Sequence, residues 1–529
     1  MLPLLGAGGA LGVSYVPRVR RYSRYIALPA VGFATLLILT FRWTVPGMVI
    51  PSLWQPSLLF GVTLALRIDA AVQPLAFALA LVTCCSIFVD LSRTEESSPR
   101  LLAILQALLA AGLLALWSAN PLTTLIGWAI YDLLQAAGLV AAGGSARAAV
   151  RSLIFGVLAT LLLWGGTLLA EDGAGSGLWA LMTPSSTQMT LWAAAGVMRL
   201  WAYPFHLVAP GNDASPLVVA LSLGPVVGWG LWLRLAMANN GVIPSVPWVL
   251  ILGAVNLGMG GFLGWCCESR RRTLSWVGMA ATGAILLAAG LAEDGAAAVV
   301  SAGSVAWTLG MGVTSLSDGW QRNAPWWSLP PLVGALVLLG LPFTLGFAME
   351  ANLIGGLTGA GSLGWGSAFF LGNMLLVPSL IRGLVSTPSA AWATGHWPHV
   401  ARGIGLGLPT LLLMMAGLYP PLIVDGVTIP SLAQLFAMPG LTGWLLWLVS
   451  LAGGAVLAWQ DATLCPKIAL WLTALHDLLS LDWLYSTVAG ALERGFGVLR
   501  AADRVVRGGG ALLWSWLLFL LILLVWSSR

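Results

Sequence analysis

Long apolar runs separated by short polar segments recur along the whole chain. About sixteen of them come close to the roughly 17–25 residues with which a helix crosses a bilayer. Helices are expected because a membrane offers no water to the backbone groups of an open strand. The pattern therefore predicts an all-α polytopic membrane protein with about 14–16 transmembrane helices. The expected spans are 2–17, 26–42, 70–92, 101–119, 121–143, 149–170, 187–209, 215–237, 246–266, 273–292, 295–315, 329–352, 361–385, 403–423, 440–460 and 511–526.

One of these spans carries a charge and then breaks. Arg199 lies inside the apolar stretch Leu191–Trp201 and precedes His206. An ionisable group at membrane depth is costly and by default marks a transport path. Proline and glycine do not continue a regular helix, so the chain is expected to open just beyond the charge. The residues assigned to this break are Pro204, Pro210, Asp213 and Pro216.

A second span breaks in the same manner. Pro342 and Gly346 interrupt an apolar run, and Glu350 follows one turn later. Two interrupted segments in corresponding places are the sequence mark of a transporter built from inverted repeats. Ordinary proline kinks in packed helices are the alternative interpretation. An ionisable group beside each break favours the first interpretation.

Arginines gather in alternate loops. Basic residues favour cytoplasmic loops, and the odd-numbered loops hold most of them, with Arg42 and Arg67 as exceptions. The N-terminus and the C-terminus are therefore predicted outside a bacterial cytoplasmic membrane. Arg234 and Arg382 fall near helix ends, where they are expected to snorkel to the interface. The arginines of the odd-numbered loops are Arg18, Arg20, Arg21, Arg24, Arg93, Arg100, Arg147, Arg151, Arg270–Arg272, Arg322 and Arg402.

Composition narrows the function classes. The chain is 59% hydrophobic and 8% charged, and its mean hydropathy of +0.91 excludes a water-soluble globular protein. The pI near 9.2 reflects the loop arginines, so it indicates contact with anionic lipid rather than binding of nucleic acid. No glycine-rich phosphate loop is present, and the five cysteines lack metal-ligand spacing. No cofactor and no metal are expected.

The segment Ser480–Arg507 differs from the spans. It mixes apolar side chains with charged ones such as Glu493, Arg500 and Arg504. Such a mixture is typical of an amphipathic helix that lies along the membrane surface, here on the cytoplasmic side. Three glycines at 508–510 then end it before the last span. An unspecific juxtamembrane linker is the alternative.

The motifs, taken in order, resemble the antiporter-like subunits of respiratory complex I. The run from Arg199 to Pro216 is similar to the broken seventh helix of that family, in which a lysine precedes Pro-Leu/Phe-His and Leu-Pro-Asp-Ala. The run from Gly340 to Glu350 is similar to its broken twelfth helix. The same family supplies subunits to multi-subunit sodium/proton antiporters, membrane-bound hydrogenases and an inorganic-carbon pump. Weaker matches, in the same order, are Asn120–Trp128, Arg272–Trp276 and Gly417–Pro421.

That resemblance implies how the chain is organised. Two inverted five-helix repeats, each with a broken helix, would occupy 101–237 and 246–423. N-terminal membrane helices would precede them in 1–100. The region 440–529 would hold a further helix, the amphipathic surface helix and the final span. In the family, each repeat supplies half of a proton path and the breaks admit water.

The chain departs from the family at the groups that should move protons. The glutamate expected after Trp128 is replaced by Ala129, and the nearest carboxylate is Asp132, one turn along on a similar face. Whether Asp132 substitutes for the missing glutamate stays open. Arg199 replaces the lysine, and a guanidinium keeps the proton that a lysine can release. The positions of the family's central polar axis fall at Ser222, Val277 and Ala281.

Glu350 and His206 complete the candidate path. Glu350 occupies the position where one branch of the family keeps a glutamate as the exit group, and it is the strongest site candidate. His206 can change charge near physiological pH, so it either passes a proton or only caps the broken helix. Asp213 is expected to cap the next span. Lys467 is the only lysine and lies outside the spans, which excludes a lysine-to-lysine relay.

Two functions of different classes fit these residues. In the first, the chain passes protons through Asp132, Arg199, His206, water and Glu350, driven by redox chemistry elsewhere in a complex I-type NADH:quinone oxidoreductase. In the second, it is a structural, non-conducting subunit of such a complex. The equivalent subunit of a cation/proton antiporter, a membrane-bound hydrogenase or an inorganic-carbon pump is a further alternative. In every case the expected partners are neighbouring membrane subunits and lipid, and the chain is not catalytic alone.

Overall fold

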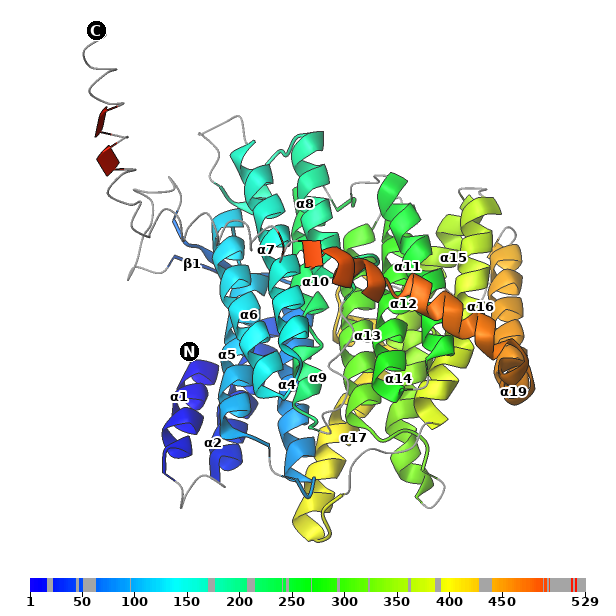
Figure 1. The fold of residues 1–529 in the computed structure, drawn as a ribbon, viewed down its shortest axis with the longest axis horizontal. Helices are drawn as coiled ribbons and strands as arrows, with labels where there is room; N and C mark the ends of the chain where they lie inside the picture. Colours follow the sequence, from blue (N-terminus) through cyan, green and yellow to red (C-terminus); the bar gives the residue numbers. More distant parts are fainter. Residues whose placement is uncertain are drawn as a thin grey trace. The chain divides into compact units, whose positions relative to one another are not determined.

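A computed structural model of the chain shows a helical membrane protein. It describes residues 1–16, 22–43, 47–50, 63–95, 97–169, 177–206, 215–239, 241–243, 247–267, 269–292, 295–321, 324–359, 363–385, 392–427 and 440–488, and a few residues between 490 and 520. The chain forms two compact units, Met1–Thr463 and Leu464–Arg529. In the first unit the helices stand side by side (Figure 1).

Helices α1 to α10 come from the first half of this unit. Their starts follow local chemistry: the side chain of Asn120 accepts a hydrogen bond from the backbone N–H of Thr123 at 2.8 Å and caps α6. The elements are α1 (Leu2–Ser14), α2 (Ser23–Thr40), η2 (Phe41–Trp43), α4 (Gln73–Leu91), α5 (Pro99–Leu116), α6 (Pro121–Ala141), α7 (Ala146–Leu168), η3 (Trp179–Leu181), α8 (Ser186–Arg199), α9 (Val218–Leu221) and α10 (Pro225–Ala238).

Helices α11 to α19 follow. Small residues let α11 approach α12 closely: a Cβ on Gly260 would lie 2.5 Å from the backbone nitrogen of Ala280. The elements are α11 (Pro247–Cys266), α12 (Arg270–Leu291), α13 (Ala296–Leu316), η4 (Pro325–Ser328), α14 (Leu329–Leu338), α15 (Leu345–Gly359), α16 (Leu363–Val385), α17 (His396–Leu418), η5 (Pro420–Leu422) and α19 (Gly440–Leu479).

Twelve helical segments among the described residues are long and apolar enough to span a membrane. Four of the expected spans are not among them. Helix α1 has only 13 residues, the span around Arg199 ends early, the span around Pro342 is divided in two, and 511–526 lies almost entirely outside the described residues. The chain is a multi-pass membrane protein, as its composition predicted.

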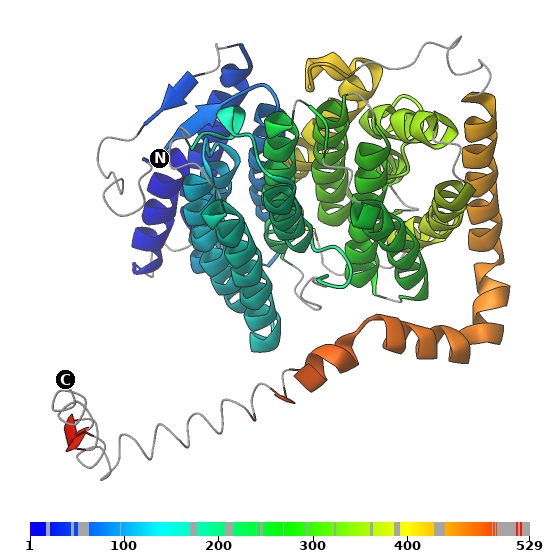
Figure 2. The ribbon, with the colours of Figure 1, turned by 90° about the horizontal axis from the view of Figure 1, so that it is seen from above.

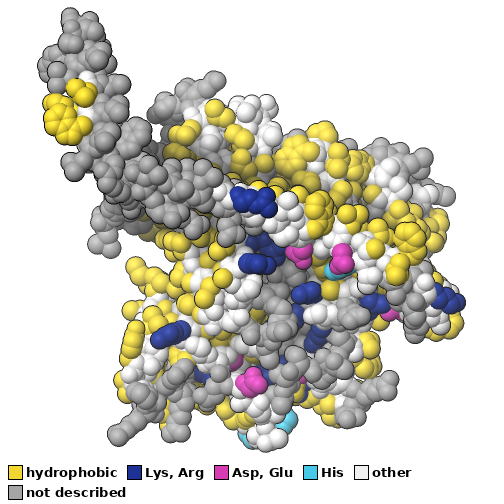
Figure 3. Space-filling view, viewed as in Figure 1, with side chains coloured by type: hydrophobic (Ala, Val, Ile, Leu, Met, Phe, Trp, Pro, Cys, Tyr) yellow, Lys and Arg dark blue, Asp and Glu magenta, His cyan; other side chains and the backbone are white. Residues whose placement is uncertain are grey.

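The helices differ in how deeply they are buried. Helices α4, α10 and α13 are covered by protein along most of their length, whereas α2 and α7 are covered along less than a third of theirs. Viewed along the helices, α5 to α8 lie on one side of the first unit and α11 to α16 on the other (Figure 2). On the face that Figure 3 shows, apolar side chains cover much of the described surface, and separate charged groups lie between them. This surface suits lipid or neighbouring subunits.

Two short strands were not predicted. β1 (Gly47–Val49) pairs antiparallel with β2 (Leu66–Ile68), with Met48 opposite Arg67. The N–H of Arg67 also donates to the carbonyl of Trp117 at 2.7 Å. Strands of three residues are too short for a periodic pattern, so the sequence showed only a connection between two spans.

Both expected helix breaks are present. Helix α8 ends at Arg199, and the non-helical segment after it contains Pro204 and His206. Pro342 lies between α14 and α15. Gly346 is required there because a Cβ would lie 2.0 Å from the carbonyl oxygen of Val337. Of the other residues assigned to the first break, Pro216 lies in the turn before α9, and Pro210 and Asp213 lie outside the described residues.

A third interruption was not predicted. The expected span 215–237 consists of α9 and α10, separated at Ser222–Gly224. Pro225 occupies the first turn of α10, where its missing N–H costs no helical bond. The amphipathic segment Ser480–Arg507 is described mainly up to Val488, where residues 482–488 are helical. The rest of that segment lies largely outside the described residues.

Candidate functional site

Arg199 and Asp132 form a buried bidentate ion pair. Nη1 of Arg199 donates to Oδ1 of Asp132, and Nη2 donates to Oδ2 at 2.7 Å. The two side chains are 4% and 3% exposed. Trp128, one turn earlier on α6, places its ring 4.5 Å from the guanidinium carbon. Helices α6 and α8 are therefore joined at the end of the broken helix.

Glycines make room for this pair. On α7, a Cβ at Gly156 would lie 2.4 Å from the carboxyl carbon and Oδ1 of Asp132. On α10, a Cβ at Gly228 would lie 2.9 Å from the Cβ of Arg199. Thr160, one turn beyond Gly156, accepts a long hydrogen bond of 3.4 Å from Nη2. Four helices thus enclose the ion pair, and they leave no room for a methyl group at Gly156 or Gly228.

His206 lies within the same break, in aromatic surroundings. Its ring is buried, stacks on Tyr203 at 5.7 Å and lies 4.6 Å from Trp276 of α12. The backbone N–H of Tyr203 donates to Oδ1 of Asn256 on α11 at 2.6 Å. The broken segment is therefore attached to α11 and α12, in the second half of the unit. The sequence did not indicate Asn256, because a single asparagine in an apolar run has no pattern.

Glu350 lies beside the second break. Its side chain is 3% exposed, on α15. Gly340, between α14 and α15, has a φ of +63°, and a Cβ there would lie 2.7 Å from the Cβ of Glu350. Trp447, near the start of α19, lies close to the carboxylate. No arginine or lysine among the described residues forms an ion pair with Glu350.

Glu350 is the exception among the buried carboxylates that the structure describes. The four buried aspartates each pair with an arginine: Asp69 with Arg234, Asp90 with Arg24, Asp132 with Arg199, and Asp318 with Arg93. A buried charge is tolerated when it is paired and hydrogen-bonded. The aspartates are therefore held as ions, and Glu350 is not held in this way.

The structure pairs both of the arginines that were expected to snorkel, and the expectation was wrong for Arg234. Arg234 does not snorkel, because it is buried against Asp69 and donates to the carbonyl of Leu116 at 3.0 Å. Arg382 pairs with Asp461 of α19 through two hydrogen bonds of 2.8 Å. Both arginines lie near helix ends, and each pairs with a carboxylate from a segment that is distant in the sequence. Sequence spacing gives no sign of such pairs.

The expected polar axis contains no ionisable group in this chain. Val277 and Ala281 are buried on α12, and Ser222 donates its hydroxyl to the carbonyl of Val219 at 2.6 Å. Lys467 is exposed. Within the described residues, no group of three or more His, Cys, Asp or Glu side chains is arranged to hold a metal ion.

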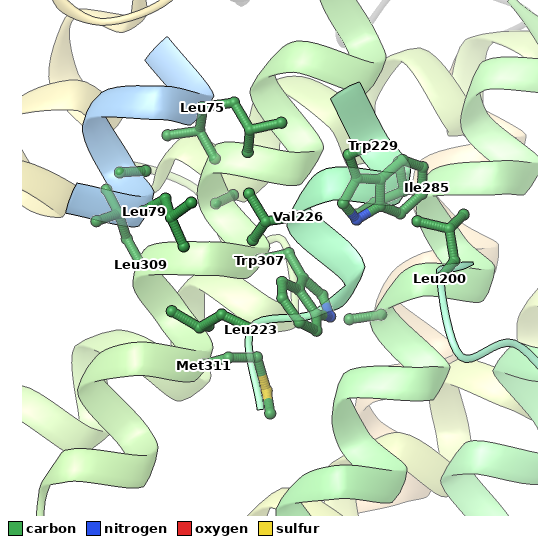
Figure 4. Close-up of a cluster of buried hydrophobic side chains, with 14 of the residues drawn as sticks. Leu75, Leu79, Leu200, Leu223, Val226, Trp229, Ile285, Trp307, Leu309 and Met311 are labelled. Carbon is green, nitrogen blue, oxygen red and sulfur yellow. The ribbon is translucent and has the colours of Figure 1, made fainter. Parts of the chain in front are cut away.

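Apolar side chains occupy the interior beside the first break (Figure 4). Leu200, Trp229 and Ile285 lie side by side in this view, next to Val226 and Trp307. We define the apolar layer as Leu200, Leu223, Val226, Trp229, Ile285, Trp307 and Met311. All seven side chains are buried.

Members of the apolar layer lie next to neighbours of both carboxylates. On one side Leu200 directly follows Arg199, and Gly228 packs against both residues. On the other side a Cβ on Gly303 would meet Cγ1 of Ile285 at 2.9 Å and the sulfur of Met349, the residue before Glu350, at 3.3 Å. The layer thus packs against residues that neighbour each carboxylate, and α12 and α13 also carry buried hydroxyl groups at Thr282, Ser304 and Thr308.

Comparison with known proteins finds relatives among the subunits of NAD(P)H-quinone oxidoreductases. No model of a known protein family matches it. It is 28% identical over 256 residues to NAD(P)H-quinone oxidoreductase chain 4-2 of Synechocystis sp., covering 44% of each protein. It is 25% identical over 317 residues to NAD(P)H-quinone oxidoreductase chain 4 2 of Trichodesmium erythraeum, covering 54% of this chain and 55% of the relative. The alignments span about half the length of these relatives.

Solved structures show the fold. A chain of the membrane-bound sulfane sulfur reductase, an archaeal respiratory membrane complex, matches with a TM-score of 0.75 and 16% identity, over 99% of this chain and 98% of that one. A chain of the Mrp complex from Dietzia sp. matches with a TM-score of 0.71 and 17% identity, over 100% of this chain and 63% of that one. A chain of respiratory complex I from Thermus thermophilus matches with a TM-score of 0.63 and 17% identity, over 86% of this chain and 98% of that one. The fold is that of an antiporter-like membrane subunit. The resemblance seen in the sequence is confirmed, and each of these structural neighbours belongs to a membrane complex.

Proposed function

We propose that the chain is an antiporter-like membrane-arm subunit of a complex I-type NADH:quinone oxidoreductase, and that Glu350 is its proton-exchanging group. The sequence relation to NAD(P)H-quinone oxidoreductase chain 4 and the antiporter-like fold support the first part. The chain would lie in a bacterial cytoplasmic membrane with its arginine-rich loops in the cytoplasm. Neighbouring membrane subunits, including other antiporter-like ones, would cover its apolar flanks.

One observation carries the assignment to Glu350. It is the single buried carboxylate, among the residues that the structure describes, that no arginine neutralises. An unpaired carboxyl group in a low-dielectric interior is most stable when neutral, and it ionises when water or a cation approaches. Such a group can take up and release a proton as the hydration of the nearby helix break changes.

The Arg199–Asp132 pair has a different role in this proposal. A guanidinium does not release its proton, and an aspartate bound through both oxygens is stabilised as an ion. The pair therefore fixes the end of α8 against α6 and does not carry the proton. His206, enclosed by Tyr203 and Trp276, holds the broken segment in place. The alternative, in which His206 passes a proton, would need water at its ring.

A structural, non-conducting subunit is the second candidate. The apolar layer favours it, because leucine, isoleucine and tryptophan side chains cannot take up and pass on a proton. The absence of an ionisable side chain at Ser222, Val277 and Ala281 favours it as well. Conduction in the first candidate would therefore be limited to the half of the chain that contains Glu350.

Substitution of Glu350 separates the two candidates. The complex is purified through a tag on this chain, reconstituted into vesicles and supplied with NADH and a quinone, and proton pumping is followed with a pH-sensitive dye. We expect Glu350→Gln to lower the number of protons pumped per electron. Glu95→Gln makes the same change on an exposed side chain and should leave pumping unchanged. Unchanged pumping in an intact Glu350→Gln complex would assign the chain to the structural role.

The same purification tests the parent complex. Mass spectrometry of the co-purifying proteins should find the NADH-binding and quinone-binding subunits of a complex I-type enzyme. If the co-purifying proteins are instead only the subunits of a cation/proton antiporter, a hydrogenase or a carbon pump, the chain belongs to that complex.

A further inference from the structure

Trp447 of α19 brings an indole N–H to the carboxyl group of Glu350. The side chain of Trp447 is 3% exposed, and its Nε1 makes no hydrogen bond with a described residue. The indole also lies within reach of the Glu350 carboxyl group. Among the described residues, no ion pair or hydrogen bond engages that carboxyl group. A free buried donor and a free buried acceptor therefore lie next to each other.

A group of aromatic rings places Trp447 on the Glu350 face of α15. The ring of Phe347 lies 5.4 Å from that of Trp444, and the ring of Trp444 meets that of Trp447 edge-on at 5.5 Å. Phe347 is three residues before Glu350, so the two side chains share one face of α15. The ring contacts thus bring the tryptophans of α19 to the face of α15 that carries the carboxyl group.

The backbone at Trp447 is fixed by neighbouring polar groups. Nδ2 of Asn373 on α16 donates to the hydroxyl of Ser450 at 3.2 Å, and this hydroxyl donates to the carbonyl of Trp447 at 2.7 Å. Helices α16 and α19 also approach closely, because a Cβ on Gly454 would lie 2.6 Å from the carbonyl oxygen of Met374. The indole N–H is therefore held in place before any charge develops, and a donor fixed in advance stabilises a charge most effectively.

Trp229 shows the same unpaired N–H in other surroundings. Its Nε1 is buried without a hydrogen-bond partner, and its ring lies beside Leu200 and Ile285 (Figure 4). A buried donor without an acceptor costs free energy, and the aliphatic neighbours of Trp229 cannot offset that cost. Beside Glu350 the same donor gains an acceptor when the carboxyl group ionises.

We infer that Trp447 is a positioning residue for proton exchange, and that its indole N–H donates a hydrogen bond to the Glu350 carboxylate whenever that group has released its proton. The inference rests on the proposed role of Glu350. A hydrogen bond to an ionised acceptor is about twice as strong as one between neutral groups. A cation at this place would hold the carboxylate ionised, as Arg199 holds Asp132. A neutral donor stabilises the ion but still permits the neutral form.

No charged neighbour competes with this donor among the described residues. Helices α12, α13, α14 and α17 pack against α15, and α13 and α14 carry no titratable side chain. The titratable groups of α12, α16, α17 and the membrane-crossing part of α19 lie toward the ends of these segments, and none acts electrostatically on Glu350. They are Arg270–Arg272, Arg382, His396, His399, Arg402 and Asp461.

Infrared spectroscopy of the purified complex tests the hydrogen bond. The C=O band of the neutral Glu350 carboxyl group is the one that Glu350→Gln removes, and its loss as the pH rises reports proton release. Trp447→Phe keeps a ring but lacks the N–H, so the band should persist to a pH about one unit higher, equivalent to a tenfold change in the equilibrium. Trp444→Phe makes the same change within the same ring contacts and should leave the titration unaltered.

An unaltered titration in Trp447→Phe, or an equal shift in Trp444→Phe, would overturn the inference. If Trp447→Phe does not assemble, benzothienylalanine incorporated in place of Trp447 serves instead. It keeps the shape of the indole and has sulfur where the N–H was, so the same shift is expected.

Proton pumping separates this inference from the proposed function. Trp447→Phe should lower the number of protons pumped per electron, and it should cause no further loss in the Glu350→Gln complex, because it acts through Glu350. An additional loss in the Glu350→Gln complex would show a merely structural role and contradict the inference. Normal pumping by Glu350→Gln would overturn the proposed function, and the infrared titration would still decide whether the hydrogen bond forms.

Discussion

The two broken helices each carry a buried carboxylate nearby, and the two carboxylates have different surroundings. Asp132 accepts both arms of the Arg199 guanidinium, with the ring of Trp128 beside the pair. Glu350 contacts Gly340 and lies close to Trp447, and no cation among the described residues pairs with it. Both side chains are almost fully buried. The difference therefore lies in charge compensation and not in depth.

This difference suits Asp132 to stabilising the fold and Glu350 to exchanging a proton. Removing one partner of a buried ion pair leaves the other charged and unsolvated, so the pair resists any change in protonation. A lone carboxyl group avoids that cost by staying neutral, and it can gain or lose a proton when its hydration changes. In our proposal, the first half of the chain has a fixed ion pair, and the second half has a carboxyl group that can change its protonation state.

The largest expected effect comes from breaking the ion pair. Asp132→Asn leaves Arg199 buried without a counter-charge, and we expect it to destabilise the chain by about 3–5 kcal/mol. The measurement is the temperature at which half of the chain leaves the detergent-solubilised complex on a native gel. Asp132→Asn combined with Arg199→Gln should recover part of the loss, because both charges are then absent.

Glu350→Gln is the matched control for this measurement. It makes a similar acid-to-amide change at a comparably buried site, and it leaves no cation unpaired among the described residues. We expect a change within about 1 kcal/mol, because the amide resembles the neutral carboxyl group. Equal destabilisation by Asp132→Asn and Glu350→Gln would show that the two carboxylates do not differ as proposed.

A smaller effect is expected from filling the space beside Asp132. Gly156→Ala would place a Cβ 2.4 Å from the carboxyl group, so the ion pair must shift. Overpacking of this kind costs about 1–3 kcal/mol. Gly165→Ala, on the same helix, meets nothing within 4 Å and should be neutral or slightly stabilising. The same native-gel temperature measures both, and equal behaviour of the two variants would mean that the pair is not tightly enclosed.

The sequence predicted the membrane architecture and both helix breaks from physical signals. Apolar runs determine spans because the bilayer has a fixed thickness. Pro204 and Pro342 indicate breaks because proline removes a backbone donor. The sequence overestimated the number of spans where an apolar run was long enough but the helix was not continuous, as around Arg199 and between α14 and α15.

The ion pairs could not be predicted from spacing along the chain. The resemblance to the family had placed Asp132 and Arg199, 67 residues apart, in one candidate path, but no sequence signal pointed to Asp69 and Arg234, which are 165 residues apart. Only the packing of α6 against α7 and α8 decides which aspartate meets which arginine. Spacing along one helix placed Asp132 on a face similar to that of Ala129, but in the structure Ala129 is exposed and Asp132 is buried. It could not show that Glu350 would be left without an arginine.

The smallest expected effect concerns the identity of the cation. Arg199→Lys keeps the charge but loses the forked geometry, and we expect a loss of about 1 kcal/mol, equivalent to one net hydrogen bond. Because the pair is fixed in our proposal, protons pumped per electron should not change, even though a lysine can release its proton. Arg234→Lys makes the same substitution in the buried pair with Asp69 and serves as the control. Altered pumping in Arg199→Lys but not in Arg234→Lys would place Arg199 and Asp132 in the proton path, because only the ability of the cation to lose its proton would distinguish that variant from the native chain.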